Sequence, residues 1–161
     1  MMSKTIVTAE PGTQQILVTR EVDAPRDLVL RAFTEPDLLK QWLGPRKYAT
    51  TIDHYDVRAG GSYRYLQRDD AGNEFGFRGV FHTGPTASGM VQTFEFEGYP
   101  GHVSMDTLTL EERDGRTIVQ TNSVFQSVED RDGMLAAGMT DGMNEGYDRL
   151  DELLAGMLAR A

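Results

Sequence analysis

The 161-residue chain contains no cysteine, which excludes disulfides, thiolate nucleophiles and cysteine-based zinc sites. It lacks any apolar run of about 18 residues, so no segment is expected to span a membrane. Residues 1–10 lack a basic stretch followed by an apolar one, so we expect no signal peptide and a cytoplasmic protein.

Positive charge is also scarce. The 16 Lys and Arg residues face 25 Asp and Glu residues, which gives a formal net charge of −9. Such a surface repels nucleic-acid phosphates and anionic lipids, so neither is an expected partner. Hydrophobic residues make up 39% of the chain and charged residues 25%, as in globular proteins. The length suits one domain.

The hydrophobic pattern and the turn residues predict the order of the helices and strands. Residues 1–13 are polar and predict a flexible N-terminal tail before a single domain over residues 14–161. Two short helices are expected after Pro25 and Pro36, with Asp23 close enough to help cap the first. Turns rich in Gly, Asp and Pro separate the predicted strands, at residues 14–22, 48–57, 62–67, 74–82, 90–97, 103–112 and 116–125.

The C-terminal part predicts one long helix. Apolar residues recur at helical spacing up to residue 159, and Ser127 with Asp130 resembles a capping box at the start. The chain is therefore expected to form an α+β fold. In it, a curved antiparallel sheet of about seven strands wraps around the long helix, and two short helices lie between the first and second strands.

Alternation along the strands predicts which side chains face inward. Aromatic residues share one strand face at positions 75 and 77, while Glu95 and Glu97 alternate with aromatic neighbours and are expected to face solvent. Arg64 and Arg78 are expected to form surface ion pairs. Val103 and Met105 are assigned together to an apolar face. A sheet of this size curls, so its apolar concave face must be covered, and the long helix is the apolar surface left to cover it.

A glycine repeat marks the predicted helix. Gly138, Gly142 and Gly146 recur every four residues and would form one ridge. Two interpretations stay open: close packing of a strand or loop backbone, or space kept for a bound molecule. Met139 and Met143 likewise suit either core filling or an adaptable ligand wall.

Catalytic signatures are missing from the pattern. His54, His82 and His102 do not have metal-ligand spacing, and no serine has a Gly-x-Ser-x-Gly setting. No phosphate-binding glycine loop followed by Lys occurs. We therefore predict no catalytic residue, no metal and no cofactor. His102 follows a glycine–proline loop and is expected near the cavity mouth.

Several local strings resemble a known family. They are residues 23–25 (DAP), 42–45 (WLGP), 56–61 (DVRAGG), 98–102 (GYPGH), 132–134 (DGM) and 138–143 (GMTDGM). Over residues 14–154 the chain resembles the helix-grip fold of the START-like (SRPBCC) superfamily, in the branch of the activator of heat-shock-protein-90 ATPase homologue. Leu43 departs from the pattern, because a second tryptophan often occupies this position.

The resemblance implies a deep hydrophobic cavity. Members of the superfamily bind lipids, sterols, polyketides or hormones, some are cyclases or aromatases, and the namesake of the branch stimulates a chaperone ATPase. The leading hypothesis is a protein that binds an apolar or amphipathic small molecule. The predicted lining is Trp42, Tyr63, Tyr65, Phe75, Phe77, Phe94, His102, Met105, Gly138, Met139, Gly142 and Met143, with Tyr65 or His102 as the polar contact.

Two other functions remain open. One is an enzyme of cyclase, aromatase or hydrolase type that uses the same cavity, which would need a buried acid or base. The other is a protein–protein module that regulates a chaperone, with Tyr99 and Pro100 as contacts. A homodimer through strand edges is also possible.

Overall fold

The computed structural model describes residues 5–160, in which eight antiparallel strands form one sheet in the order β1-β2-β8-β7-β6-β5-β4-β3. The strands are β1 (Thr5–Thr8), β2 (Gln15–Val22), β3 (Ala49–Tyr55), β4 (Ser62–Arg68), β5 (Glu74–Thr86), β6 (Gly89–Phe96), β7 (Val103–Arg113) and β8 (Arg116–Val124). The helices are α1 (Arg26–Thr34), α2 (Pro36–Leu39), α3 (Val128–Ala136) and α4 (Met139–Arg160).

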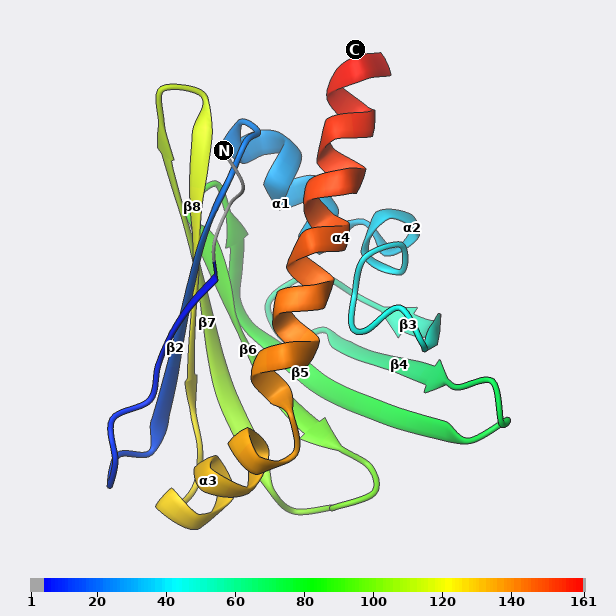
Figure 1. Cartoon of the computed structure of the whole chain (residues 1–161), viewed down its shortest axis with the longest axis vertical. Coiled ribbons are helices and arrows are strands. Elements are labelled where there is room, and N and C mark those ends of the chain that lie inside the picture. Colours follow the sequence, from blue (N-terminus) through cyan, green and yellow to red (C-terminus); the bar gives the residue numbers. More distant parts are fainter. Residues whose placement is uncertain (1–4, 161) are drawn as a thin grey trace.

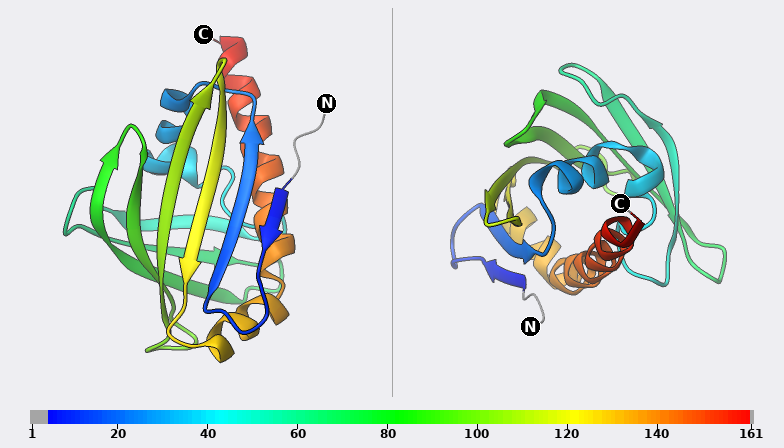
Figure 2. Two further views of the ribbon diagram at one scale, coloured as in Figure 1. Left: turned by 90° about the vertical axis from the view of Figure 1, so that its left-hand side faces the viewer. Right: turned by 90° about the horizontal axis from the view of Figure 1, so that it is seen from above.

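The sheet forms a curved wall, and α4 lies along its concave side (Figures 1 and 2). Helices α1 and α2 lie toward one end of the sheet and α3 toward the other (Figure 1). This arrangement confirms the predicted α+β helix-grip fold. The seven predicted strands are all present, with ends that differ by a few residues.

The eighth strand corrects the predicted tail. Thr5–Thr8 is β1, which pairs with β2 from Thr5 opposite Arg20 to Thr8 opposite Leu17. Its inner residue Val7 packs against the core. A single inward-facing apolar residue in this four-residue strand therefore anchors an additional edge strand on the sheet. Residues 1–4 of the predicted tail lie outside the described residues.

The predicted long helix is divided in two. Helix α3 ends at Ala136 and α4 begins at Met139, with Gly138 at φ +89° between them. A left-handed glycine of this kind ends helices because it lacks the Cβ that would clash. Ser127 caps α3 as predicted, since its side chain accepts a hydrogen bond from the Asp130 backbone N–H.

The start of α1 differs from the prediction. Pro25 is the N-cap residue, and no side chain caps the helix. The Asp23 carboxylate lies 3.2 Å from the Arg116 guanidinium instead. The prediction that Asp23 caps α1 was therefore wrong.

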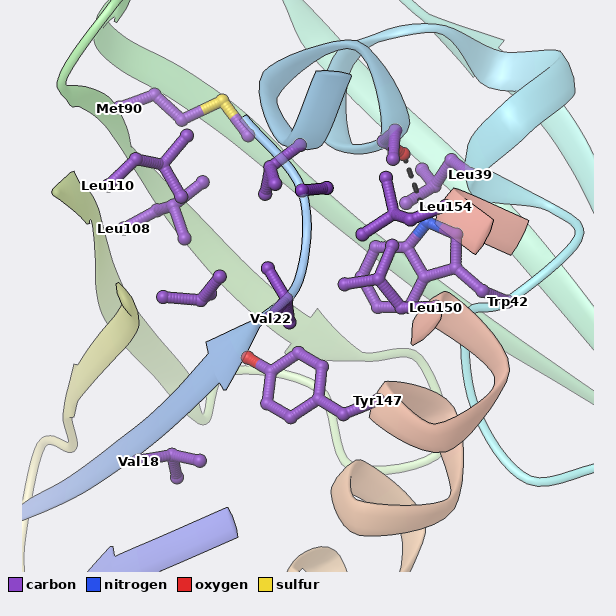
Figure 3. Packing of buried hydrophobic residues seen from close by; sticks show 14 of the residues in the cluster. Val18, Val22, Leu39, Trp42, Met90, Leu108, Leu110, Tyr147, Leu150 and Leu154 are labelled. Atoms are coloured by element: carbon purple, nitrogen blue, oxygen red, sulfur yellow. Dashed lines mark hydrogen bonds between the residues drawn. The ribbon is translucent and has the colours of Figure 1, made fainter. Parts of the chain in front are cut away.

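The C-terminal half of α4 is fixed to the core. Leu150 and Leu154 are buried with apolar residues of β2 and β7, and Tyr147, less than one turn earlier, is buried beside them (Figure 3). Nearby, the Trp42 indole Nε1 donates a 3.0 Å hydrogen bond to the Ala32 carbonyl, which satisfies the polar atom of this buried ring. The N-terminal half of α4 contributes Met139 and Met143, which are only partly buried.

Two buried arginines tie the helices to the N-terminal strands. The Arg20 guanidinium on β2 lies 2.8 Å from Asp148 and 2.5 Å from Asp151, both on α4. Arg131 on α3 donates to the Glu10 carbonyl at 2.8 Å and pairs with Asp132. Both contacts hold a helix over the sheet with charge-assisted hydrogen bonds. In the part of the chain that the structure describes, no helix is long and apolar enough to cross a membrane.

Candidate ligand-binding site

A cavity of about 340 Å³ lies between the concave face of the sheet and the N-terminal half of α4. Its walls are mainly aromatic and aliphatic. The aromatic lining residues are Phe33, Trp42, Tyr55, Tyr63, Tyr65, Phe77, Phe94, Phe125 and Tyr147, and the methionines are Met90, Met134, Met139 and Met143. The volume lies within the range of small-molecule pockets.

Four aromatic rings form a stacked row across β4, β5 and β6. Ring centroids are 6.2 Å apart for Tyr63 and Tyr65, 5.1 Å for Tyr65 and Phe77, and 5.5 Å for Phe77 and Phe94. The register produces the row, because Tyr65 lies directly opposite Phe77 and alternate residues face the same side. The result is a continuous aromatic wall on one side of the cavity.

The structure brings together eight of the twelve predicted lining residues. Those at the cavity are Trp42, Tyr63, Tyr65, Phe77, Phe94, Met139, Gly142 and Met143. The other four, Phe75, His102, Met105 and Gly138, do not line it.

Phe75 lies on the predicted sheet face but beyond the cavity. Its ring packs against Tyr48 and Phe96, at centroid distances of 5.8 and 6.3 Å. Gly138 lies in the turn before α4, and a Cβ built on it would meet nothing within 4 Å. Neither residue is a wall of the cavity, which corrects the prediction for both.

Met105 lies on the outer face of the sheet and is 49% exposed. The inner face of β7 carries Ser104, Asp106, Leu108 and Leu110 instead. The prediction was wrong because Val103 and Met105 were taken as the apolar side of a strand whose inner side begins with two polar residues. A shift of one residue reverses every side chain.

His102 forms a contact between a loop and a helix. Its Nδ1 lies 2.9 Å from an Asp130 carboxylate oxygen on α3, and its ring stacks on Tyr99 at 3.7 Å between centroids. This pair ties the β6–β7 loop to α3. The expected ligand contact by His102 was therefore wrong.

The helix glycines allow close approach of a loop. A Cβ on Gly146 would lie 3.3 Å from the Trp42 carbonyl oxygen and from the Gly44 nitrogen. A Cβ on Gly142 would lie 3.6 Å from Pro45. Loop backbone packing thus explains Gly146, although both glycines also border the cavity.

Sequence reasoning missed a polar patch on the inner wall of the sheet. Asp106 on β7 lies directly opposite Gln92 on β6 and Ser123 on β8. The Ser104 Oγ donates a 3.1 Å hydrogen bond to Asp106 Oδ1. All four side chains line the cavity, together with Thr121.

Burial raises the pKa of the Asp106 carboxyl to about 6, although hydrogen bonds from Ser123 and Ser104 oppose the rise. A carboxyl with this pKa changes charge near neutral pH. The sequence did hold a signal for it. Leu108 and Leu110 are two and four residues further along the strand, so their burial places Asp106 on the same inner face.

The tyrosine hydroxyls at the cavity differ in availability. The Tyr63 hydroxyl donates to the Thr93 carbonyl, and the Tyr147 hydroxyl lies 3.3 Å from Thr121 Oγ1. The Tyr65 hydroxyl makes no hydrogen bond within residues 5–160. Desolvation by burial raises the pKa of Tyr65 well above its ordinary value, so the phenol stays a neutral donor.

Other charged groups lie outside the cavity. Arg64 pairs with Glu97 at 2.7 Å and Arg78 with Glu95 at 3.0 Å, which confirms both predicted surface pairs. Among the described residues, no cluster of three His, Cys, Asp or Glu could hold a metal ion.

Similar folds occur among solved structures. A protein from Arthrobacter aurescens has a TM-score of 0.86 at 24% identity, with 94% of this chain and 91% of that chain covered. Protein Ms6760 from Mycobacterium smegmatis has a TM-score of 0.84 at 22% identity, with 94% and 97% covered. A protein from Rhodobacter sphaeroides has a TM-score of 0.85 at 24% identity, with 93% and 98% covered. These likenesses show the fold alone.

No curated protein gives a significant match to this chain. The family described as "Activator of Hsp90 ATPase homolog 1-like protein" matches residues 23–155. This span covers the helix-grip domain from the segment before α1 to most of α4. The chain therefore belongs to the Activator of Hsp90 ATPase homolog 1-like family, within the START-like superfamily.

Proposed function

We propose that this protein binds an apolar or amphipathic small molecule in the cavity between the sheet and α4. The observation that carries the proposal is the open volume of about 340 Å³ behind a stacked aromatic wall. Protein interiors normally fill such a space with side chains, because an unfilled apolar cavity lowers stability. A ligand that buries its apolar surface here would recover those contacts.

Methionines on the helical side favour an adaptable fit. Met134 on α3 and Met139 and Met143 on α4 line the cavity opposite the rigid aromatic row. Methionine has three rotatable bonds and a polarisable sulfur, so it adjusts to ligands of different shape. The combination favours recognition of an apolar body and tolerates some variation in its shape.

The test is binding of prodan, a neutral naphthalene dye whose emission shifts to the blue in apolar surroundings. We expect a saturable blue shift with the wild-type protein. Met143→Trp fills the cavity and is expected to weaken binding by about tenfold, because a bulky side chain occupies the ligand volume.

A matched variant controls for the added indole. Met105→Trp makes the same exchange on the outer face of β7 and is expected to leave prodan binding unchanged. Circular dichroism establishes that each variant is folded. No saturable shift with the folded wild-type protein, or equal weakening by both variants, contradicts the proposal.

A second candidate function is catalysis in the same cavity, which Asp106 favours. A carboxyl whose pKa lies near 6 can donate or accept a proton at neutral pH. Ser104 and Ser123 would hold it in position. The test is product formation from compounds that bind, compared between the wild-type protein and Asp106→Asn. Equal rates in the two proteins would exclude Asp106 as the acid or base.

A regulatory contact with a chaperone remains a prediction that draws on the family's name. Tyr99 in the β6–β7 loop is 57% exposed, as a contact residue would be. The measurement is recovery of the protein's partners with the wild-type chain and with Tyr99→Ala. A chaperone recovered only with the wild-type chain would support this role.

A further inference from the structure

Within residues 5–160, no countercharge accompanies the carboxylate at the cavity. Asp106 is the only carboxylate among the lining residues, and no Lys, Arg or His lines the cavity in the part of the chain described. Nor does any salt bridge between described residues involve Asp106. Asp106 is half-buried. A carboxylate that is largely desolvated is normally paired with a cation or a metal, because desolvation of an isolated charge is costly.

The hydrogen-bond partners leave part of the carboxylate free. Ser104 Oγ donates to Asp106 Oδ1, and Ser123 on the neighbouring strand also donates to the carboxylate. An ionised carboxylate has about four acceptor sites, so two hydroxyl donors do not saturate it. The remaining sites border the cavity, where a ligand donor could reach them.

The rest of the cavity suits the same ligand. Tyr63, Tyr65, Phe77 and Phe94 present a row of aromatic rings, and Tyr147 and Trp42 lie on the helical side. Aromatic rings supply apolar contact for the body of a ligand, and a ring whose face meets a cation also attracts it. A net charge of −9 also raises the local concentration of cations and disfavours anionic ligands.

We infer that the cavity recognises an organic cation, a protonated amine carried on an apolar or aromatic body, with the nitrogen against Asp106. This inference rests on the proposed function and names the ligand class for the same site. The aromatic row would hold the apolar body, and Asp106 would accept the N–H donors of the amine. Such a charge-assisted hydrogen bond is about twice as strong as one between neutral groups.

The test uses three probes that share one ring system. They are 2-(2-naphthyl)ethylamine, 2-(2-naphthyl)ethanol and the carboxylate 2-naphthaleneacetate, and the measurement is how well each one displaces prodan from the wild-type protein at pH 7.5. We expect the amine to bind about tenfold more tightly than the alcohol, and the carboxylate most weakly. Equal displacement by amine and alcohol, or no displacement by either, overturns the inference while prodan binding leaves the proposed function standing.

Two variants separate a local effect from general attraction. Asp106→Asn keeps the shape of the side chain and removes its charge, so it is expected to abolish the preference for the amine. Asp37→Asn removes the same charge from a side chain that is 93% exposed, and is expected to retain the preference. A preference that survives Asp106→Asn, or is lost in both variants, contradicts the assignment of the nitrogen to Asp106.

A pH series on the wild-type protein gives a second measurement that needs no variant. Amine affinity is expected to fall as the pH drops below about 6, where Asp106 takes up a proton. Affinity for the neutral alcohol is expected to stay within about twofold over the same range. Parallel pH profiles for the two probes would overturn the inference.

Discussion

Ser104 donates a 3.1 Å hydrogen bond from its Oγ to Oδ1 of Asp106, two residues further along β7. Both side chains line the cavity. The hydroxyl stabilises the ionised carboxyl, while burial among apolar walls destabilises it. The charge state of the cavity near neutral pH depends on the balance of these two effects.

Ser104→Ala is expected to raise the pKa of Asp106 above about 6, because the variant removes a hydrogen bond that lowers it. NMR titration of the aspartate side-chain carboxyl carbons measures the change. Ser88→Ala, in the exposed turn before β6, is the control and should leave the value unaltered. An unchanged pKa in Ser104→Ala would show that the hydroxyl does not act on the carboxyl.

Asp106→Asn is expected to stabilise the protein above pH 6. The pKa of Asp106 is about 6 when folded against an ordinary value of 3.8, so the folded state binds more protons between these values. Stability of the wild-type protein therefore falls, through this group, as the pH rises from about 4 to 6. The gain in the variant should reach about 1–3 kcal/mol above pH 6 and be absent below about pH 4.

Urea unfolding of both proteins from pH 3.5 to 7.5 measures this difference in the free energy of unfolding. The pH-dependent contributions of the other carboxylates are the same in both proteins and cancel in the difference. A constant offset between the two proteins at every pH would contradict the expectation. So would a gain that appears only at the acidic end.

Gly142→Ala and Gly146→Ala are expected to have opposite effects on stability. A Cβ at Gly142 meets Pro45 at an ordinary contact distance, so alanine should stabilise α4 by about 0.5–1 kcal/mol. A Cβ at Gly146 would lie 3.3 Å from loop backbone, which cannot move as easily as a side-chain tip, so alanine should destabilise. Thermal unfolding of the two variants checks the order, and stabilisation by both would show that the loop yields.

Arg20→Ala is expected to destabilise the fold by about 2–4 kcal/mol, because it removes a buried charge from two aspartates on α4. The Arg20 side chain is only 2% exposed. Arg113→Ala provides the comparison, since that side chain is 67% exposed and its pair with Glu111 should contribute less than about 1 kcal/mol. Equal losses in urea unfolding would mean that Arg20 does not fix α4 to β2.

The fold could be predicted because its signals were local. Turn residues separated the strands, and apolar spacing marked the helical region, so the order of elements followed directly. The break at Gly138 could not be inferred from spacing, because a helical glycine and a left-handed one look alike in sequence. The left-handed conformation of Gly138, at φ +89°, separates α3 from α4.

The site was predicted where strands alternate cleanly, as at Phe77 and Phe94. It was missed on β7, where Ser104 and Asp106 face inward and Met105 faces outward. The hydrophobic pattern of a strand assigns polar residues to the solvent face. It therefore fails where polar side chains line a cavity, as they do here. Leu108 and Leu110, which lie further along β7, indicated the correct inner face of this strand.

The two halves of α4 have different tasks, and this has a consequence for how the family diversifies. Leu150 and Leu154 pack the helix against the core, whereas Met139 and Met143 line the cavity. Under the proposed function, exchanges at the two leucines would mainly lower the stability of the fold. Exchanges at the two methionines would mainly change which ligand the cavity accepts, so ligand preference could change while the fold stays the same.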